Sequence, residues 1–189
     1  MLAAGRSSRL GQPKQLLRYR GRTLLDVSLD VARACEFDQL LVTLGGAADE
    51  VRSTVDLKGA TVVDNVHYTS GCSSSIVAAL DEIDERAESL VLMLGDQPNI
   101  DSGSVAVLRA QCATVGAEIG VCHYDDGRGH PFWFARSMFD ELRGLHGDKA
   151  VWKMLESGHW KVAEVEVPGP VPLDVDTWDD YRELIGADS

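Results

Sequence analysis

The chain has 189 residues, of which 44% are hydrophobic and 25% are charged, as in an ordinary globular protein. A chain of this length fits one domain and buries about 70% of its unfolded surface. Its formal net charge of −12 argues against broad nucleic-acid binding, and no apolar stretch approaches the roughly 20 residues needed to cross a bilayer. We therefore expect one domain over residues 1–189 that binds neither nucleic acid nor a membrane.

The cysteines favour a reducing compartment. The chain has four cysteines: Cys35, Cys72, Cys112 and Cys122. No two of them have the CxxC spacing of a zinc or redox site. We expect reduced thiols that behave as small hydrophobic residues. The opening residues 1–5 are too short to be a secretion signal, so we expect a cytoplasmic protein.

Short apolar runs alternate with helical patterns along the chain. A short strand at residues 1–4 comes first, and a helix follows over residues 24–34, behind Thr23 as a possible N-cap. Further strands are expected at 40–44, 61–63, 90–94, 119–122, 132–134 and 162–167. Further helices are expected at 47–56, 76–87, 102–114, 136–145, 147–156 and 177–185. This alternation predicts an α/β fold, a three-layer sandwich with a mostly parallel central sheet.

Ligands of such sheets bind beyond the carboxyl ends of the strands, where the first strand runs into a glycine-rich loop. Residues 2–14 read LAAGRSSRLGQPK, and residues 1–25 hold six basic side chains but no Asp or Glu. Glycine at Gly5 and Gly11 lets backbone N–H groups approach phosphate oxygens, and Arg9 and Lys14 add cationic donors. The loop matches neither a Walker P-loop nor a GxGxxG fingerprint, so taken alone it could equally be a turn with surface charges.

Two later segments place carboxylates where a metal could bind. Asp96 directly follows the buried strand at 90–94, and Mg²⁺ takes one or two carboxylates plus substrate phosphates. Asp176 lies in LDVDTWDDY at 173–181, and Asp174 alternates with it, so both would share one strand face. From the pattern alone, Asp96 could equally cap a turn and Asp176 could equally be the N-cap of the helix from Thr177.

Two further segments point to ligand contacts. Gly71 and three serines open the helix after residue 72, and a helix N-terminus suits an anionic group. Gly129-His130-Pro131 precedes a strand, although a lone histidine is often a structural hydrogen-bonding group.

Taken in order, these motifs resemble those of the MobA-like NTP transferase superfamily over essentially the whole chain. LAAGxSxRxGxxK matches without a break, and the AAG and GDQP motifs make the molybdenum cofactor cytidylyltransferase family the closest branch. The resemblance implies a Rossmann-like nucleotidyltransferase (GT-A-like) fold with Mg²⁺ held by Asp96 and Asp176. It implies that the nucleotide contacts are Leu2, Ala3, Ala4, Gly5, Arg6, Arg9, Lys14, Asn65, Gly71, Ser75, Gly95 and Asp96.

The resemblance further implies that Lys14, Arg9 and Asp96 are catalytic. The segment implied to lie near the acceptor comprises Gly129, His130, Pro131 and Asp148. The chain departs from the family pattern at Ala150, which replaces a glycine, and at Val151-Trp152, which replaces the common Ala-Arg. That departure bears on the acceptor contacts and leaves the nucleotide motifs intact.

The activity implied is transfer of a nucleoside monophosphate from an NTP to a phosphorylated acceptor, with release of pyrophosphate. CTP and molybdenum cofactor (molybdopterin) are the favoured substrates, and a molybdenum hydroxylase is a possible partner. GTP, or a sugar-phosphate or phospho-acid acceptor, is the first alternative. A non-catalytic chaperone that binds the cofactor is the second, and a nicotinamide-binding module is disfavoured because the chain lacks GxGxxG.

Overall fold

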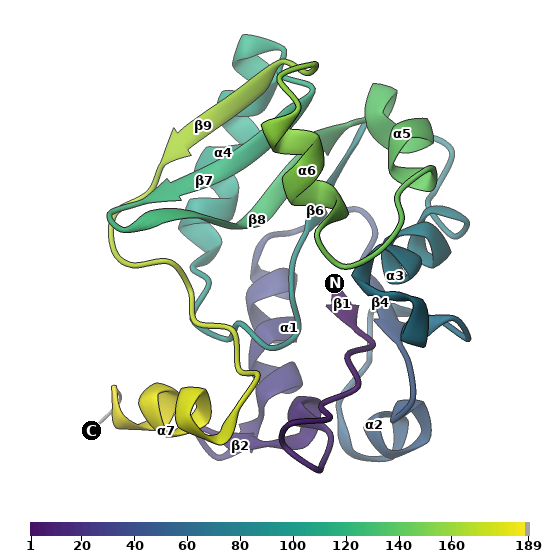
Figure 1. Ribbon diagram of the computed structural model, residues 1–189, viewed down its shortest axis with the longest axis vertical. Coiled ribbons are helices and arrows are strands. Elements are labelled where there is room, and N and C mark those ends of the chain that lie inside the picture. Colours follow the sequence, from purple (N-terminus) through teal and green to yellow (C-terminus); the bar gives the residue numbers. More distant parts are fainter. Residues whose placement is uncertain (188–189) are drawn as a thin grey trace.

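The computed structural model describes residues 1–187 and alternates strands and helices much as the sequence predicts (Figure 1). The strands are β1 (Leu2–Ala3), β2 (Arg18–Tyr19), β3 (Arg22–Thr23), β4 (Leu41–Leu44), β5 (Thr61–Asp64), β6 (Ser89–Leu92), β7 (Ile119–Tyr124), β8 (Gly127–Ala135) and β9 (Val162–Glu166). The α-helices are α1 (Leu24–Ala34), α2 (Ala48–Thr54), α3 (Cys72–Leu80), α4 (Ser102–Val115), α5 (Phe139–Arg143), α6 (Ala150–Glu156) and α7 (Trp178–Gly186). No helix within these 187 residues is long and apolar enough to span a bilayer.

The central sheet is mostly parallel, as predicted. Leu2 of β1 pairs in parallel with Thr43 of β4 on one side and with Leu94, beyond β6, on the other. The strand order is therefore β5-β4-β1-β6-β8-β7-β9, and the β4–β5 and β7–β9 pairs are also parallel. Only β8, among the described strands of this sheet, runs antiparallel to both neighbours. The two-residue connection between β7 and β8 makes them a hairpin, and hairpin strands must be antiparallel.

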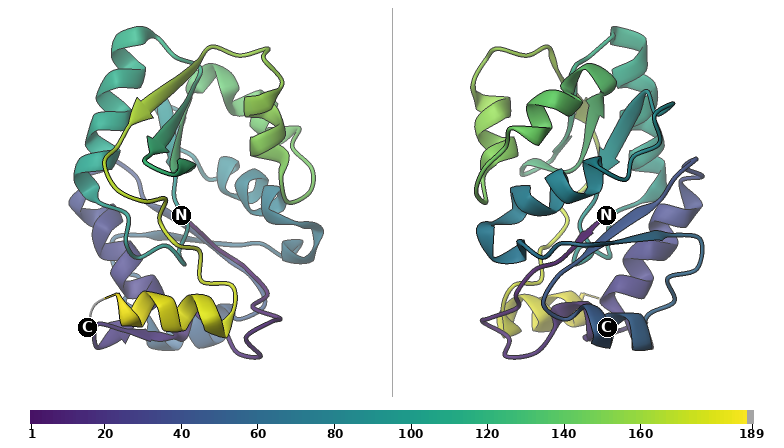
Figure 2. Two further views of the ribbon diagram at one scale, coloured as in Figure 1. Left: turned by 60° about the vertical axis from the view of Figure 1, so that its left-hand side comes forward. Right: turned by 90° about the vertical axis from the view of Figure 1, so that its right-hand side faces the viewer.

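Helices cover both faces of the sheet, which confirms the predicted three-layer α/β fold (Figure 2). On one face α3, α5 and α6 bury apolar side chains against Leu2 and the strands β6 to β8. On the other face α1 and α4 pack against Met1, Ala3 and β4, and the rest of α4 packs against β7 to β9. Successive residues of β1 thus point to opposite layers, as the pleat of a buried strand requires.

Several element boundaries differ from those predicted. The helix predicted over 76–87 ends at Leu80, yet Ile83 and Ala87 still pack against the core from a turn. That turn is held by Asp84, whose N–H donates to Gln39 Oε1 and whose carboxylate accepts from the Arg86 N–H. The predicted helix at 136–145 divides into a 3₁₀ turn and α5, and the β2–β3 hairpin has no counterpart in the prediction.

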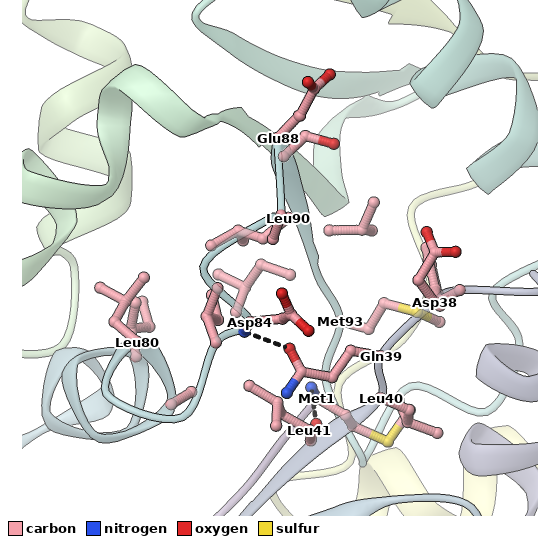
Figure 3. A pocket seen from close by; sticks show the side chains of 18 of the residues that line it. Met1, Asp38, Gln39, Leu40, Leu41, Leu80, Asp84, Glu88, Leu90 and Met93 are labelled. Atoms are coloured by element: carbon pink, nitrogen blue, oxygen red, sulfur yellow. Dashed lines mark hydrogen bonds between the residues drawn. The ribbon is translucent and has the colours of Figure 1, made fainter.

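A cavity of about 530 Å³ interrupts the sheet beside Met1, between β4 and β6 (Figure 3). The Met1 ammonium is buried there and donates a hydrogen bond of 2.7 Å to the Leu41 carbonyl oxygen. Its burial lowers the pKa of the terminal amine from 8.0 to about 5. Most of the surrounding side chains are aliphatic, and Gln39 crosses the opening to reach the Asp84 backbone.

Candidate nucleotide and metal site

The glycine-rich loop that follows β1 is fixed by a buried glutamine. Gln15 donates from Nε2 to the Ala3 carbonyl oxygen at 2.6 Å and to the Gly5 carbonyl oxygen at 3.3 Å. The Lys14 N–H donates to Ser7 Oγ at 2.9 Å, which closes the loop on itself. A Cβ at Gly5 would lie 3.3 Å from Lys14 Cε, so glycine gives the lysine side chain its room.

Lys14 brings together two carboxylates that are 80 residues apart in the chain. Its ammonium donates to Asp96 Oδ2 and, at 2.7 Å, to Asp176 Oδ1. Arg9 adds an ion pair of 3.3 Å with Asp176 Oδ2. The side chains of Lys14 and Asp96 are 13% and 11% exposed, whereas that of Asp176 is 49% exposed. The geometry therefore unites the predicted catalytic and metal-binding residues at the carboxyl edge of the sheet.

The charges of Asp96 and Asp176 offset the cost of burying the Lys14 ammonium. Burial alone would lower the pKa of Lys14, but the charges and hydrogen bonds of Asp96 and Asp176 raise it above its ordinary value. The lysine is thus a permanent cation between two acceptors.

Asp176 is free to face this site because a different residue caps α7. Thr177 Oγ1 accepts a hydrogen bond from the Asp180 N–H, and the Asp180 carboxylate accepts from the Thr177 N–H in return. This capping box makes Thr177 the N-cap, so the alternative that Asp176 caps the helix is wrong. The Asp96 carboxylate likewise has the Lys14 ammonium as its partner.

Asp174 lies on the same side of its extended segment as Asp176, although the segment joins no strand. Asp174 is exposed to solvent. The protein around it nevertheless desolvates the carboxylate enough to raise its pKa to about 6, and the negative charge of Asp96 acts in the same direction.

The site opens into a cavity of about 740 Å³, within the range of about 300–1,000 Å³ that is usual for ligand pockets. The glycine-rich loop and the three aspartates line one part of it. His130, Phe132 and Trp152 line another part, where β8 and α6 face each other. Of the predicted site residues, those lining the cavity are Leu2, Ala3, Ala4, Gly5, Arg6, Arg9, Lys14, Gly71, Ser75, Gly95, Asp96, His130, Asp148 and Asp176.

Three predicted residues do not line the cavity. Asn65 is buried and donates from Nδ2 to the hydroxyls of Ser74 and Ser75 at 2.8 and 2.9 Å, so it fixes the start of α3. Gly129 and Pro131 lie in β8 on either side of His130. Of these three residues, only His130 lines the cavity. Burial lowers the pKa of His130 to about 4, so the ring is neutral near pH 7.

The N-terminus of α3 already has an anionic partner. The Asp148 carboxylate accepts a hydrogen bond of 2.9 Å from the Cys72 N–H. Gly71, with a φ of 103°, lies so close that a Cβ there would be 2.8 Å from the same carboxylate oxygen. Asp148 therefore occupies the position where the sequence predicts an anionic ligand.

Sequence reasoning overlooked two contributors to this site. One is Gln15, whose only sequence signal is a polar residue directly before the apolar pair Leu16-Leu17. The other is Trp152, which the sequence marks only as a departure from a motif.

The two carboxylates suit a divalent cation, because both already bind the same ammonium. Within the described part of the chain, no group of three or more His, Cys, Asp or Glu side chains is placed to hold a metal ion. A cation bound by Asp96 and Asp176 would thus take its remaining ligands from phosphate oxygens and water, as Mg²⁺ commonly does.

Comparison with known proteins finds one family over most of the chain. The family model for the MobA-like NTP transferase domain matches residues 1–164. Nicotine blue oxidoreductase of Paenarthrobacter nicotinovorans is 33% identical over 109 residues, and the match spans 57% of this chain and only about half (53%) of that protein. The molybdenum cofactor cytidylyltransferase of Escherichia coli (strain K12) is 26% identical over 185 residues, which cover 95% of this chain and 90% of the relative.

Two solved structures share about half of their sequence with this chain as well as its fold. A homologue of Mycobacterium tuberculosis Rv0371c from Mycobacterium sp. strain JC1 is 54% identical, with a TM-score of 0.92 over 98% of this chain and 93% of that chain. Rv0371c of M. tuberculosis H37Rv in complex with manganese is 50% identical, with a TM-score of 0.84 over 98% of this chain and 96% of that chain. A close homologue thus binds a divalent metal.

Proposed function

Since the chain belongs to the MobA-like NTP transferase family, we propose that it transfers CMP from CTP to the phosphate of molybdenum cofactor and releases pyrophosphate. The observation that carries the proposal is the convergence of Lys14, Asp96 and Asp176 beside the glycine-rich loop. The match to the NTP transferase family model supports the reaction class. The relative named molybdenum cofactor cytidylyltransferase supports the substrates.

In this proposal the loop holds the triphosphate. Backbone N–H groups near Gly5 approach the phosphate oxygens, while Arg6, Arg9 and Lys14 surround the same oxygens with positive charge. Lys14 leaves the two carboxylates and turns to the phosphates when the nucleotide enters. Gly71 and Ser75 lie across the cavity and limit where the nucleotide sits.

Asp96 and Asp176 would hold Mg²⁺. When bound, the ion neutralises charge on the triphosphate and orients it. An oxygen of the acceptor phosphate attacks the α-phosphorus, and the bond from that phosphorus to the β-phosphate oxygen breaks. The nucleophile is already ionised, so the chain needs no general base, and positioning and charge supply the catalysis.

The proposal extends to the domain organisation, the partner and the location of the protein. The Lys14–Asp176 ion pair ties the segment after residue 164 to the N-terminal loop, which supports one domain over residues 1–189. A molybdenum hydroxylase that takes up the finished dinucleotide is the proposed partner, and the cytoplasm is the proposed location.

The direct test measures pyrophosphate release and the mass of the product. The chain is incubated with Mg²⁺ or Mn²⁺, with molybdenum-loaded molybdopterin, and with CTP, GTP, ATP or UTP in turn. The proposal predicts a product of molybdopterin plus CMP, formed fastest from CTP. A GMP adduct would overturn the choice of base, and transfer only to a sugar phosphate or phospho-acid would overturn the acceptor. Tight cofactor binding without pyrophosphate from any NTP would instead identify a carrier protein.

A further inference from the structure

The acceptor side of the cavity is built from three rings in a row. The His130 and Phe132 rings are 4.3 Å apart at 48°, and the Phe132 and Trp152 rings are 5.1 Å apart at 84°. Phe132 is buried, so it acts as a fixed backing for the other two rings. Trp152 is half-buried and lines the cavity, so part of its indole remains available to a ligand.

The packing of α6 fixes the position of this indole. Val151, Met154 and Leu155 of α6 are buried in the core cluster that includes Phe132, and Trp152 packs against the same cluster. The edge-to-face contact with Phe132 is a favoured geometry for aromatic pairs. The indole is therefore held by the core and not by a flexible loop.

The chemistry of this end differs from that of the phosphate end. The cationic side chains Arg6, Arg9 and Lys14 all lie on the glycine-rich loop, whereas the ring row offers aromatic surface and one neutral imidazole. Charged groups appear again only at the rim, where Asp148 and Lys149 are exposed. This arrangement complements a flat molecule with apolar faces and polar edges.

From this geometry we infer that Trp152, backed by Phe132, is a stacking platform that selects a planar heterocyclic acceptor over a sugar phosphate. The inference rests on the proposed nucleotidyl transfer and names the class of its acceptor. A sugar phosphate presents a hydroxyl on most of its carbons, and burying these groups without hydrogen-bond partners is unfavourable.

The test compares two probes and three variants by isothermal titration calorimetry. The probes are 6-hydroxymethylpterin monophosphate and glucose 1-phosphate, each titrated with and without Mg²⁺ and a non-hydrolysable CTP analogue. The variants are Trp152→Leu, Trp152→Phe and the matched control Trp160→Leu. Trp160 is half-buried like Trp152 and packs on the same core cluster, but it does not line the cavity.

We expect the unaltered protein to prefer the pterin phosphate. Trp152→Leu should weaken pterin binding at least about fivefold, the lower limit for losing one stacking contact with a base. Trp152→Phe should keep most of the affinity, Trp160→Leu should stay within about twofold, and the Kd of the CTP analogue should be unchanged in all three. Unchanged pterin binding in Trp152→Leu, or tighter binding of glucose 1-phosphate by the unaltered protein, would overturn the platform.

Failure of the proposed function gives a different result. If the unaltered protein does not bind the CTP analogue, the transferase proposal fails, while the titrations without nucleotide still decide whether Trp152 selects a planar ring.

Discussion

Replacing Lys14 by methionine should have opposite effects on free metal and on nucleotide. The ammonium of Lys14 now bonds to both carboxylates, so a cation that binds alone must first displace it. Methionine matches the lysine side chain as far as Cε but lacks the ammonium and its charge. The variant should therefore bind free Mn²⁺ more tightly and bind the triphosphate less tightly than the unaltered protein.

The structure sets the scale of the effect. A hydrogen bond to a charged group contributes about 1.5–3 kcal/mol, and Lys14 makes two of them. The share from Asp176 is reduced because that side chain is 49% exposed and solvent screens the pair. Part of the energy of these two hydrogen bonds offsets the cost of burying the ammonium. We therefore expect Lys14→Met to gain at least about 1.4 kcal/mol in Mn²⁺ binding, or about tenfold in Kd.

The assay is titration of Mn²⁺ followed by the electron paramagnetic resonance signal of the free ion. The CTP analogue is then titrated by calorimetry in the presence of Mn²⁺, where the variant should bind at least about tenfold more weakly for want of a charged donor to phosphate. Lys58→Met is the matched control, because Lys58 is exposed and does not line the cavity. Equal or weaker affinity of Lys14→Met for free Mn²⁺ would refute the reasoning.

Thermal denaturation shows whether the Lys14→Met variant is folded. Loss of Lys14 leaves Asp96 buried without its cation, so the Tm should fall in the absence of metal and recover when Mn²⁺ is added.

Two further predictions concern Asp96 and Asn65. Asp96→Asn should reduce pyrophosphate release at least about 100-fold, because it removes a charge from the metal site. Circular dichroism should show an intact fold, and an unchanged rate would remove Asp96 from the mechanism. Asn65→Ala should lower the free energy of unfolding by about 1–3 kcal/mol, since the buried Ser75 hydroxyl and the partly buried Ser74 hydroxyl lose their donor. Urea denaturation measures this loss, and an unchanged free energy would show that α3 does not depend on that amide.

The parts of the site that local sequence specifies were predictable. The glycine-rich loop places its own cations near its own backbone, and Asp96 directly follows a buried strand, so their chemistry is visible over a few residues. The pairing of Asp96 with Asp176 is not local, and only the resemblance to a family connected them. The capping box of Thr177 and Asp180 was visible in the sequence, and it would have freed Asp176 from the role of N-cap.

Other features depend on tertiary packing that periodicity does not encode. Ile83 and Ala87 continue the apolar spacing of α3 because they pack against the core, although the chain there has left the helix. The direction of β8 follows from the short turn before Gly127, which the two adjacent aspartates signal only weakly. The role of Trp152 depends on where α6 lies over β8, which no pattern within α6 specifies.

The opening in the sheet beside Met1 has a practical consequence for labelling the protein. Any residue joined to Met1 would begin between β4 and β6, in the cavity that Met1 lines (Figures 1 and 3). As a peptide group, the Met1 N–H would keep its hydrogen bond to the Leu41 carbonyl oxygen, but an affinity tag or fluorescent reporter fused there would have to pass through this cavity. Attachment after α7, which lies at the periphery of the molecule, avoids that passage.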